Sequence, residues 1–430
     1  MVFTTCAIIW KMPDIINLAR SIKEQLPEEL IDFIKQAGEV AQREQQRLYL
    51  VGGVVRDLLL ERRNLDLDLV IEGDAIKLAQ EIAESQSVKV TTHPRFGTAT
   101  IHWSSRSADV ATARAETYAR PGALPAVKSG TISDDLSRRD FTINAMAIEL
   151  NPRHFGDIID PYGGRQDLDN KLVRVLHDKS FIDDATRIWR ALRYEQRLDF
   201  HLELATLELL KQCTAWLGTV SGDRIRHELE LALKEEQPEK VLRRADELGV
   251  LDRVHPSLKC DDWLRETFTL AREHYLPDTS PQPQLYLALL CYRLSAKVIE
   301  QIISYLRLPK DTTQVLRETI AIKEKVNQLA TPGRAPSQIY ELIHCYGMTA
   351  LMANSLAAGS ETAAEHIELY QNVLRHVNPA LSGEDLKKLG VPEGPKIKEM
   401  LKKLREARLD GKVTSRKDEV EMVKGWESSS

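Results

Sequence analysis

The pattern of apolar and polar positions divides the chain into a first part with strand signals and a longer part that is mostly helical. Apolar side chains recur at three- and four-residue spacing over residues 15–45, which predicts a helix. Residues 47–51 form an apolar run and residues 65–71 alternate Asp with apolar residues, so both predict strands. Between them we expect a turn at Gly52-Gly53 and a short helix over residues 54–61.

Three further runs, at residues 88–91, 98–103 and 108–111, predict additional strands. From residue 181 onward strand signals nearly vanish, and amphipathic helices separated by prolines follow. We therefore predict an α+β head, a mixed sheet with flanking helices, followed by an elongated all-helical neck, body and tail. The predicted domains are an N-terminal helical segment (1–45), the head (46–160), the neck (161–235), the body (236–377) and the tail (378–430).

Composition is typical of a globular chain of several domains. The 430 residues exceed what one core usually holds, and 43% are hydrophobic against 29% charged. Apolar runs stay shorter than the roughly 18 residues needed to cross a bilayer, and the start lacks the features of a signal peptide, so we expect a cytoplasmic protein. The cysteines are scattered without CxxC spacing, which argues against a disulfide framework and a zinc site. We expect them to be reduced and mostly buried: Cys6, Cys213, Cys260, Cys291 and Cys345.

The net charge of −5 conceals a basic segment near the C-terminus. Residues 396–417 hold nine Lys and Arg against three acidic residues. A basic tail on an acidic body is typical of an RNA-binding end, and composition alone is equally compatible with a solvated helix of mixed charge.

Two carboxylates point to metal chemistry in the head. Asp66 and Asp68 are two apart on a predicted strand, so both project from the same face. Such a pair is stable beside a divalent cation, and Mg²⁺ prefers oxygen ligands. A lone DxD is more often a solubility pattern on an edge strand. Asp109, on a neighbouring predicted strand, is the best candidate for a third acid, and three acids can hold two metal ions.

The turn before these acids favours a phosphate site. Gly52-Gly53 leads directly into a predicted helix, where backbone N–H groups and the helix dipole attract a triphosphate. Arg56, in the first turn of that helix, can reach the same anion. A metal site beside a triphosphate site predicts phosphoryl transfer onto an RNA 3′-hydroxyl with two metal ions.

The turn, helix and acidic strand resemble the nucleotidyltransferase head of the polymerase β superfamily. Residues 138–147, Arg-Arg-Asp-Phe-Thr-Ile-Asn-Ala-Met-Ala, resemble the signature of bacterial, class II tRNA nucleotidyltransferases and their poly(A) polymerase relatives. The resemblance is strong from residue 48 to 230 and loose afterward. It implies that Arg138 and Arg139 meet the triphosphate, that Asp140 meets the ribose, and that Asn144 belongs to the nucleotide site.

Residues 160–168 and 181–193 resemble the neck of that family. Asp184 and Arg187 are three apart on a predicted helix and so share a face, where an ordinary salt bridge is the alternative interpretation. A carboxylate accepts and a guanidinium donates hydrogen bonds, which complements the pairing edges of C and A and opposes those of U and G. The family is thought to select bases in this way. Arg190, in the same motif, is expected to bind nucleotide.

Asp183 stands where the family usually has Glu, so its role is open. The tail of the family is resembled by residues 381–386 and 394–398, and we predict that Lys396, Lys398 and Lys402 contact the RNA backbone.

The resemblance implies an enzyme that adds CCA, or part of it, to the 3′ end of tRNA from CTP and ATP with Mg²⁺. A-only addition and poly(A) synthesis use nearly the same motifs. CC-only addition is disfavoured, because residues 114–130 fill the region of the flexible loop that CC-only members lack in part. A non-catalytic RNA-binding protein is the alternative of another class, and intact Asp66, Asp68 and Arg139 argue against it. Beyond tRNA and nucleotides, the sequence indicates neither a membrane nor an obligatory protein partner.

Overall fold

The computed structural model of the chain describes residues 17–86, 88–103, 106–117, 126–275 and 282–428. It forms two compact units, residues 1–220 and 221–430, which are described separately. The first unit holds the mixed sheet with its flanking helices, and the second is helical, as the sequence predicts.

The described part of the first unit begins with two helices within the segment that the sequence predicts to be helical. α1 (Ala19–Gln25) and α2 (Glu28–Arg43) are separated at Leu26, which is extended at φ −93° and ψ 146°. The helical segment predicted over residues 15–45 is thus confirmed within the described residues, with one break, because Pro27 disfavours helical backbone at the residue before it.

The central sheet has seven strands in the order β3-β4-β5-β2-β1-β8-β9. β2 and β5 are parallel, and the other neighbouring pairs are antiparallel. In this register Asp68 of β2 is paired with Asp109 of β5. The bounds are β1 (Arg47–Val51), β2 (Leu67–Glu72), β3 (Lys89–His93), β4 (Thr98–Trp103), β5 (Arg106–Thr112), β8 (Ala147–Glu149) and β9 (Ile158–Ile159).

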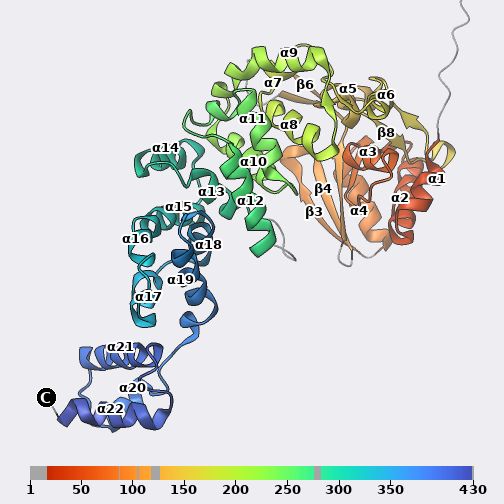
Figure 1. The fold of residues 1–430 in the computed structure, drawn as a ribbon. Coiled ribbons are helices and arrows are strands. Elements are labelled where there is room, and N and C mark those ends of the chain that lie inside the picture. The colour runs from red at the N-terminus through yellow and green to blue at the C-terminus, as the bar shows by residue number, and fades with distance from the viewer. Residues whose placement is uncertain (1–16, 87, 104–105, 118–125, 276–281, 429–430) are drawn as a thin grey trace, which may run out of the picture. The chain divides into compact units, whose positions relative to one another are not determined.

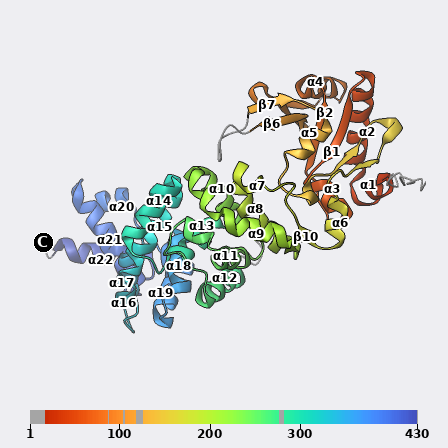
Figure 2. The same cartoon turned by 90° about the horizontal axis from the view of Figure 1, so that it is seen from above.

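Helices cover both faces of the sheet. α2 and α4 (Ala75–Gln86) lie together on one face (Figure 1). On the other face, α5 (Ile132–Ser137) contributes Ile132 and Leu136 to a core with Tyr49, Val51 and Val70. Figure 2 shows the hairpin of β6 (Arg114–Thr117) and β7 (Ala126–Ser129), whose first strand contacts α5. The short helix α3 (Gly53–Leu59) follows β1 directly.

The end of the first unit is mostly helical but not wholly so. β10 (Leu172–Val173) and β11 (His201–Leu202) form a small parallel pair. The all-helical neck is therefore wrong in this detail, because two-residue strands are too short to show a period-two pattern. The helices are α6 (Gly164–Asp169), α7 (Ser180–Asp183), α8 (Thr186–Leu198) and α9 (Leu204–Cys213).

The second unit is built from helices around two hydrophobic clusters. One includes Ile322, Ile339 and Ile367, and the other, in the tail, includes Leu386, Leu404 and Val423. The helices of this unit are α10 (Gly222–Leu233), α11 (Pro238–Glu247), α12 (Asp262–Tyr275), α13 (Pro283–Cys291), α14 (Ala296–Leu306), α15 (Lys310–Lys323), α16 (Val326–Leu329), α17 (Pro336–Ile343), α18 (Met348–Ala357), α19 (Glu361–Asn372), α20 (Gly383–Lys388), α21 (Pro395–Leu409) and α22 (Arg416–Ser428).

Most of the described cysteines are buried, as the sequence predicts. Cys213, Cys260 and Cys291 are buried free thiols and Cys345 is an exposed one, whereas Cys6 lies outside the described residues. In the part of the chain that the structure describes, every helix is too short or too polar to cross a bilayer.

Candidate active site

A cavity of about 560 Å³ opens in the first unit and gathers most of the residues singled out in its sequence. This volume is within the range of small-molecule sites. The cavity is lined by Gly52, Gly53, Val54, Arg56, Asp57, Asn64, Asp66, Asp68, Glu116, Arg138, Arg139, Asp140, Asn144, Asp184, Arg187, Arg190, Tyr194 and Arg197.

The acidic residues lie where β2 begins. Asp66 precedes β2 by one residue, so the prediction that Asp66 and Asp68 share a strand is wrong, although both line the cavity. The side chain of Asn64 accepts a hydrogen bond from the backbone N–H of Asp66, which holds this segment outside the ladder. Asp68 is two residues before Val70 and therefore projects from the face that α5 covers.

Asp109 lies beside Asp68 but outside the cavity lining. Its strand is the neighbour of β2 that the sequence predicts, and the two residues are in register. Neighbouring strands are about 4.8 Å apart, so the two carboxylates project from one face at short range. One oxygen of Asp109 accepts a 2.7 Å hydrogen bond from the hydroxyl of Thr100.

These carboxylates influence one another. Partial burial of the carboxyl group raises the pKa of Asp68, and the negative charges of Asp109 and Asp66 raise it further, against the lowering effect of Arg139. Among the described residues, no group of three or more Asp, Glu, His or Cys side chains is close enough to hold a metal ion as it stands. The metal-binding roles of Asp66, Asp68 and Asp109 therefore stay predictions.

The turn between β1 and α3 requires glycine. Gly52 has φ +75°, and a Cβ at this position would lie 2.7 Å from Nη1 of Arg139. The absent side chain thus makes room for a guanidinium directly over the turn. Arg56, at the other end of the first turn of α3, is buried and donates to both carboxylate oxygens of Asp57 and to the amide oxygen of Asn144.

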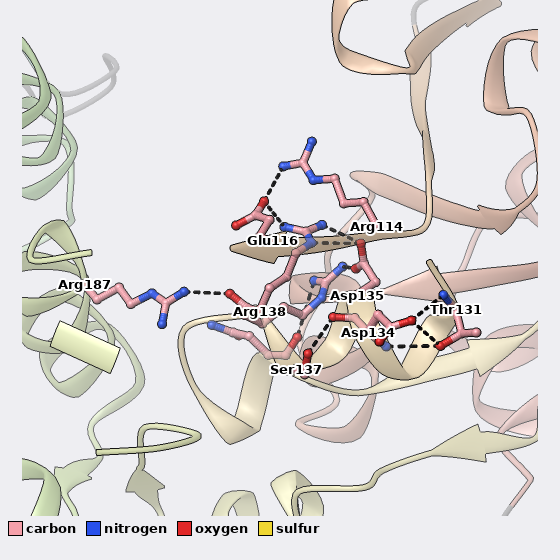
Figure 3. A network of polar contacts seen from close by, with 10 residues as sticks. Arg114, Glu116, Thr131, Asp134, Asp135, Ser137, Arg138 and Arg187 are labelled. Carbon is pink, nitrogen blue, oxygen red and sulfur yellow. Dashed lines mark hydrogen bonds and ion pairs between the residues drawn. The ribbon is translucent and has the colours of Figure 1, made fainter. Parts of the chain in front are cut away.

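The two arginines after α5 share one buried carboxylate (Figure 3). Asp135 is 0% exposed and accepts a 2.5 Å hydrogen bond from Arg138 and a 3.0 Å bond from Arg139. Arg138 also forms an ion pair of 3.3 Å with Glu116 of β6. Sequence reasoning missed Asp135 and Glu116. The spacing of Asp135, three and four residues before the two arginines, was a usable signal on a helix.

Asp140 forms a second charged cluster on the cavity wall. Its carboxylate pairs with Arg190 at 2.7 Å and accepts a 3.1 Å hydrogen bond from the amide of Asn144. Burial opposes its ionisation, but Arg190, Asn144 and Arg187 together hold the pKa of Asp140 below its usual value. Asp140 is therefore an anion in the folded protein at neutral pH.

Asp184 and Arg187 both line the cavity, but not from one helix. Asp184 lies between α7 and α8 with extended backbone, and its Oδ1 accepts hydrogen bonds from the N–H and hydroxyl of Thr186. The shared helical face is therefore wrong, because the Asp side chain satisfies the first N–H groups of α8 instead of continuing a helix. Arg187, inside α8, donates to Ser180 and to the carbonyl of Arg138.

The predicted RNA-binding lysines lie in the second unit, on α21. Gly394 is the residue before this helix, at φ +123°. Lys398 is exposed, whereas Lys396 pairs with Glu427 at 2.9 Å and Lys402 pairs with Glu341 at 2.7 Å. Their role stays a prediction. Of the predicted loop over residues 114–130, the structure describes β6 and β7, and residues 118–125 lie outside the described residues.

Two family models match the chain. A model described as the poly A polymerase head domain matches residues 48–174. A second, described as a probable RNA and SrmB-binding site of polymerase A, matches residues 199–261.

Several curated relatives match nearly the whole chain. The A-adding tRNA nucleotidyltransferase of Halalkalibacterium halodurans is 34% identical over 95% of this chain and 95% of its own length. That of Geobacter sulfurreducens is also 34% identical over 94% of this chain, which spans 48%, or about half, of the length of that relative. The CCA-adding enzyme of a Geobacillus species is 29% identical over 86% of this chain and 91% of its own length.

Solved structures of CCA-adding enzymes also match nearly the whole chain. An apo form of a CCA-adding enzyme has a TM-score of 0.81 at 29% identity, covering 96% of this chain and 100% of that one. A CCA-adding enzyme in complex with ATP has a TM-score of 0.80 at 28% identity, covering 97% and 100%. The Thermotoga maritima CCA-adding enzyme complexed with tRNA has a TM-score of 0.75 at 29% identity, covering 96% and 100%.

Proposed function

The chain belongs to the family of bacterial-type tRNA nucleotidyltransferases and their poly(A) polymerase relatives, and we propose that it adds CCA, or part of it, to the 3′ end of tRNA from CTP and ATP. The observation that carries this proposal is the composition of the cavity. It brings together the carboxylates at the start of β2, the glycine turn before α3, the arginines after α5 and the Asp184–Arg187 pair around 560 Å³ of space.

In this proposal the turn and the arginines hold the triphosphate. The N–H groups at the start of α3 and the guanidinium of Arg139 above Gly52 offer donors and positive charge to phosphate oxygens. The Nε of Arg139 is buried and lacks a hydrogen-bond partner among the described residues, which suits a site that is completed by an anionic ligand. Asp140, ionised and held by Arg190, is available as an acceptor for a ribose hydroxyl.

The acidic residues supply the oxygen ligands that a divalent cation prefers, although the three side chains are not close enough to hold one as they stand. Burial of Asp68 and the negative charges of Asp109 and Asp66 raise the pKa of Asp68, and a bound cation would offset these costs of ionisation. We propose that these three residues hold Mg²⁺, which when bound activates a 3′-hydroxyl and stabilises the leaving pyrophosphate. Asp68 is the central member, because it lies both on the cavity wall and in register with Asp109.

Base selection is assigned in the proposal to Asp184 and Arg187. A carboxylate that accepts and a guanidinium that donates match the amine and ring nitrogen of C and A. Arg187 is held from two sides, by Ser180 at 2.8 Å and by the carbonyl of Arg138 at 2.6 Å. A guanidinium fixed in this way keeps one direction for its remaining N–H groups, as a template must.

The test offers the purified protein tRNAs that end before CCA, after the first C and after CC, each with labelled CTP or ATP. Incorporation of CTP on the first two and of ATP on the third supports CCA addition. The tRNA ending in CC with GTP or UTP is the matched control and should stay unextended. If the parent protein incorporates no nucleotide on any of the three tRNAs, the proposed enzymatic function is wrong and the RNA-binding alternative is favoured.

A-only addition remains the second candidate, since relatives of both the A-adding and the CCA-adding kind match the chain over most of its length. The same assay separates the two, because an A-adding enzyme extends only the tRNA that ends in CC. Repeated ATP addition would instead indicate poly(A) synthesis. The cytoplasmic location expected from the sequence stays a prediction.

A further inference from the structure

A second cavity of about 270 Å³ lies in the first unit, between the 3₁₀ turn η1 (Pro94–Phe96) and the β6–β7 hairpin. Its wall includes two arginines, Arg95 and Arg114, and the apolar side chains of Phe96 and Val127. None of the described residues that line it is acidic. An aromatic ring between cations is the combination that binds the bases and phosphates of single-stranded nucleic acid.

The apolar side chains of this cavity are unusually open to solvent. Phe96 is 63% exposed and Val127 is 50% exposed, and the guanidinium of Arg95 lies 5.7 Å from the centre of the Phe96 ring. One exposed Phe by itself is common on protein surfaces. Here the Nε of Arg114 is in addition buried without a hydrogen-bond partner among the described residues, so this guanidinium has unused capacity to donate hydrogen bonds.

This cavity is connected to the nucleotide cavity by one carboxylate. Glu116 pairs with Arg114 at 3.0 Å and with Arg138 at 3.3 Å (Figure 3). Arg114 lines the second cavity, whereas Glu116 and Arg138 line the first. A ligand that reaches both cavities therefore meets a continuous wall of charged side chains within one compact unit.

We propose that the second cavity binds an unpaired base of the RNA 3′ end, with Phe96 stacking on the base and Arg95 and Arg114 contacting its phosphates. The inference rests on the proposed function and adds a subsite to it. Charge favours RNA as the occupant over a protein surface, because the described lining holds two arginines and no acidic residue, although Glu116 outside the lining pairs with Arg114. Stacking tolerates any base, so the subsite contributes affinity and leaves the choice of incoming nucleotide unchanged.

The experiment measures the affinity of Phe96→Ala for two RNA hairpins of equal stem, one with an unpaired 3′ CC end and one blunt. We expect the variant to bind the overhanging RNA roughly 10-fold more weakly and the blunt RNA as the parent does. The KM for ATP, at saturating RNA, should stay unchanged. Leu204→Ala is the matched control, because Leu204 is an 80% exposed apolar residue on α9 of the same unit. Phe96→Trp should restore affinity, with its fluorescence quenched by the overhanging RNA.

Equal weakening for both RNAs, or unchanged affinity for both, overturns the subsite. A loss in Phe96→Trp as large as that in Phe96→Ala does the same. Failure of the proposed function is distinguishable, because it removes nucleotide incorporation from the parent protein whereas failure of the subsite leaves parent incorporation intact. A rise in the KM for ATP in Phe96→Ala also counts against the proposal, since it would make Phe96 part of the nucleotide cavity.

Discussion

The guanidinium of Arg187 donates a 2.6 Å hydrogen bond to the backbone carbonyl of Arg138. The side chain of Arg138 is in turn held by Asp135, which also binds Arg139. The proposed base-reading residue is thus joined to Arg138 through the backbone of Arg138, and Arg138 and Arg139 are joined through one buried carboxylate. A substitution at Asp135 should therefore affect the binding of both the triphosphate and the base of the nucleotide.

The substitution Asp135→Asn tests this connection between the arginines. It removes the charge from the three hydrogen bonds that Asp135 accepts from Arg138 and Arg139. Hydrogen bonds to a charged group each contribute about 1.5–3 kcal/mol, so we expect kcat/KM for ATP to fall by roughly 10- to 100-fold through a higher KM. Steady-state kinetics on tRNA ending in CC provides the measurement. Asp134→Asn is the matched control, because among the described residues the side chain of Asp134 accepts hydrogen bonds only from Thr131, at the start of α5. Equal KM values for the two variants would contradict the positioning role.

The variant Asp184→Ala should lose base discrimination. Without the carboxylate, the amine of A or C is left without its acceptor, and the ratio of ATP to GTP incorporation should fall at least about 10-fold. The same change removes the hydrogen bonds to Thr186, which costs about 1 kcal/mol as a helix cap. Thr186→Val weakens that cap while keeping the carboxylate, so it controls for stability. If it loses discrimination equally, Asp184 acts through the helix start alone.

Gly52→Ala should damage the nucleotide site more than its backbone strain explains. A Cβ here would meet Nη1 of Arg139 at 2.7 Å, so the guanidinium must move. Gly163→Ala is a close control, because Gly163 also has positive φ, +71°, with nothing within 4 Å of its added Cβ. Gly163→Ala should lose about 1 kcal/mol of stability and Gly52→Ala more, because a φ of +75° with a ψ of −130° is suited to glycine. Only Gly52→Ala should lose ATP binding in calorimetry. Unchanged ATP affinity in Gly52→Ala would contradict the proposed contact.

Asp68→Asn should lose activity while gaining stability at neutral pH. Because the pKa of Asp68 is raised in the folded state, its ionisation disfavours folding as pH rises from the ordinary value of 3.8 through the raised value. The variant should therefore be more stable than the parent at pH 7 without divalent ions, and the difference should shrink toward about pH 4. Denaturant unfolding at both pH values measures it. A parent that is the more stable protein at pH 7 would contradict the raised pKa of Asp68.

Added Mg²⁺ provides the complementary measurement on the same pair of proteins. It should raise the unfolding midpoint of the parent at pH 7 and leave that of Asp68→Asn nearly unchanged, because a ligand stabilises only the state that binds it. An equal rise in both proteins would place the stabilising cation elsewhere.

Lys398→Ala should weaken tRNA binding uniformly and reduce its dependence on salt. Loss of one phosphate contact lowers the slope of log affinity against log salt by about 1. Lys398 is exposed near the start of α21, and Lys297, exposed on α14, serves as the control. Filter binding at several salt concentrations gives both slopes. A slope equal to that of the parent would remove Lys398 from the interface.

Much of the head could be read from local pattern. The strands over residues 47–51 and 98–103 coincide with β1 and β4, because alternation and β-branched content act over a few neighbouring residues. The signature over residues 138–147 identified the family without any geometry. The boundaries of helices and strands were predicted less accurately, as the break before Pro27 and the start of β2 after Asp66 demonstrate.

The chain by itself therefore determined which residue types meet a triphosphate and a base, since those are properties of side chains and short spacings. The way in which these residues are held in place depends on the three-dimensional fold. The Arg56–Asn144 hydrogen bond joins residues 88 apart, and the Arg187–Arg138 bond joins residues 49 apart. Asp68 meets Asp109 through strand register. Such pairings depend on how the whole unit folds back on itself, and no local pattern encodes them, because burial and partner choice are set by segments distant in sequence.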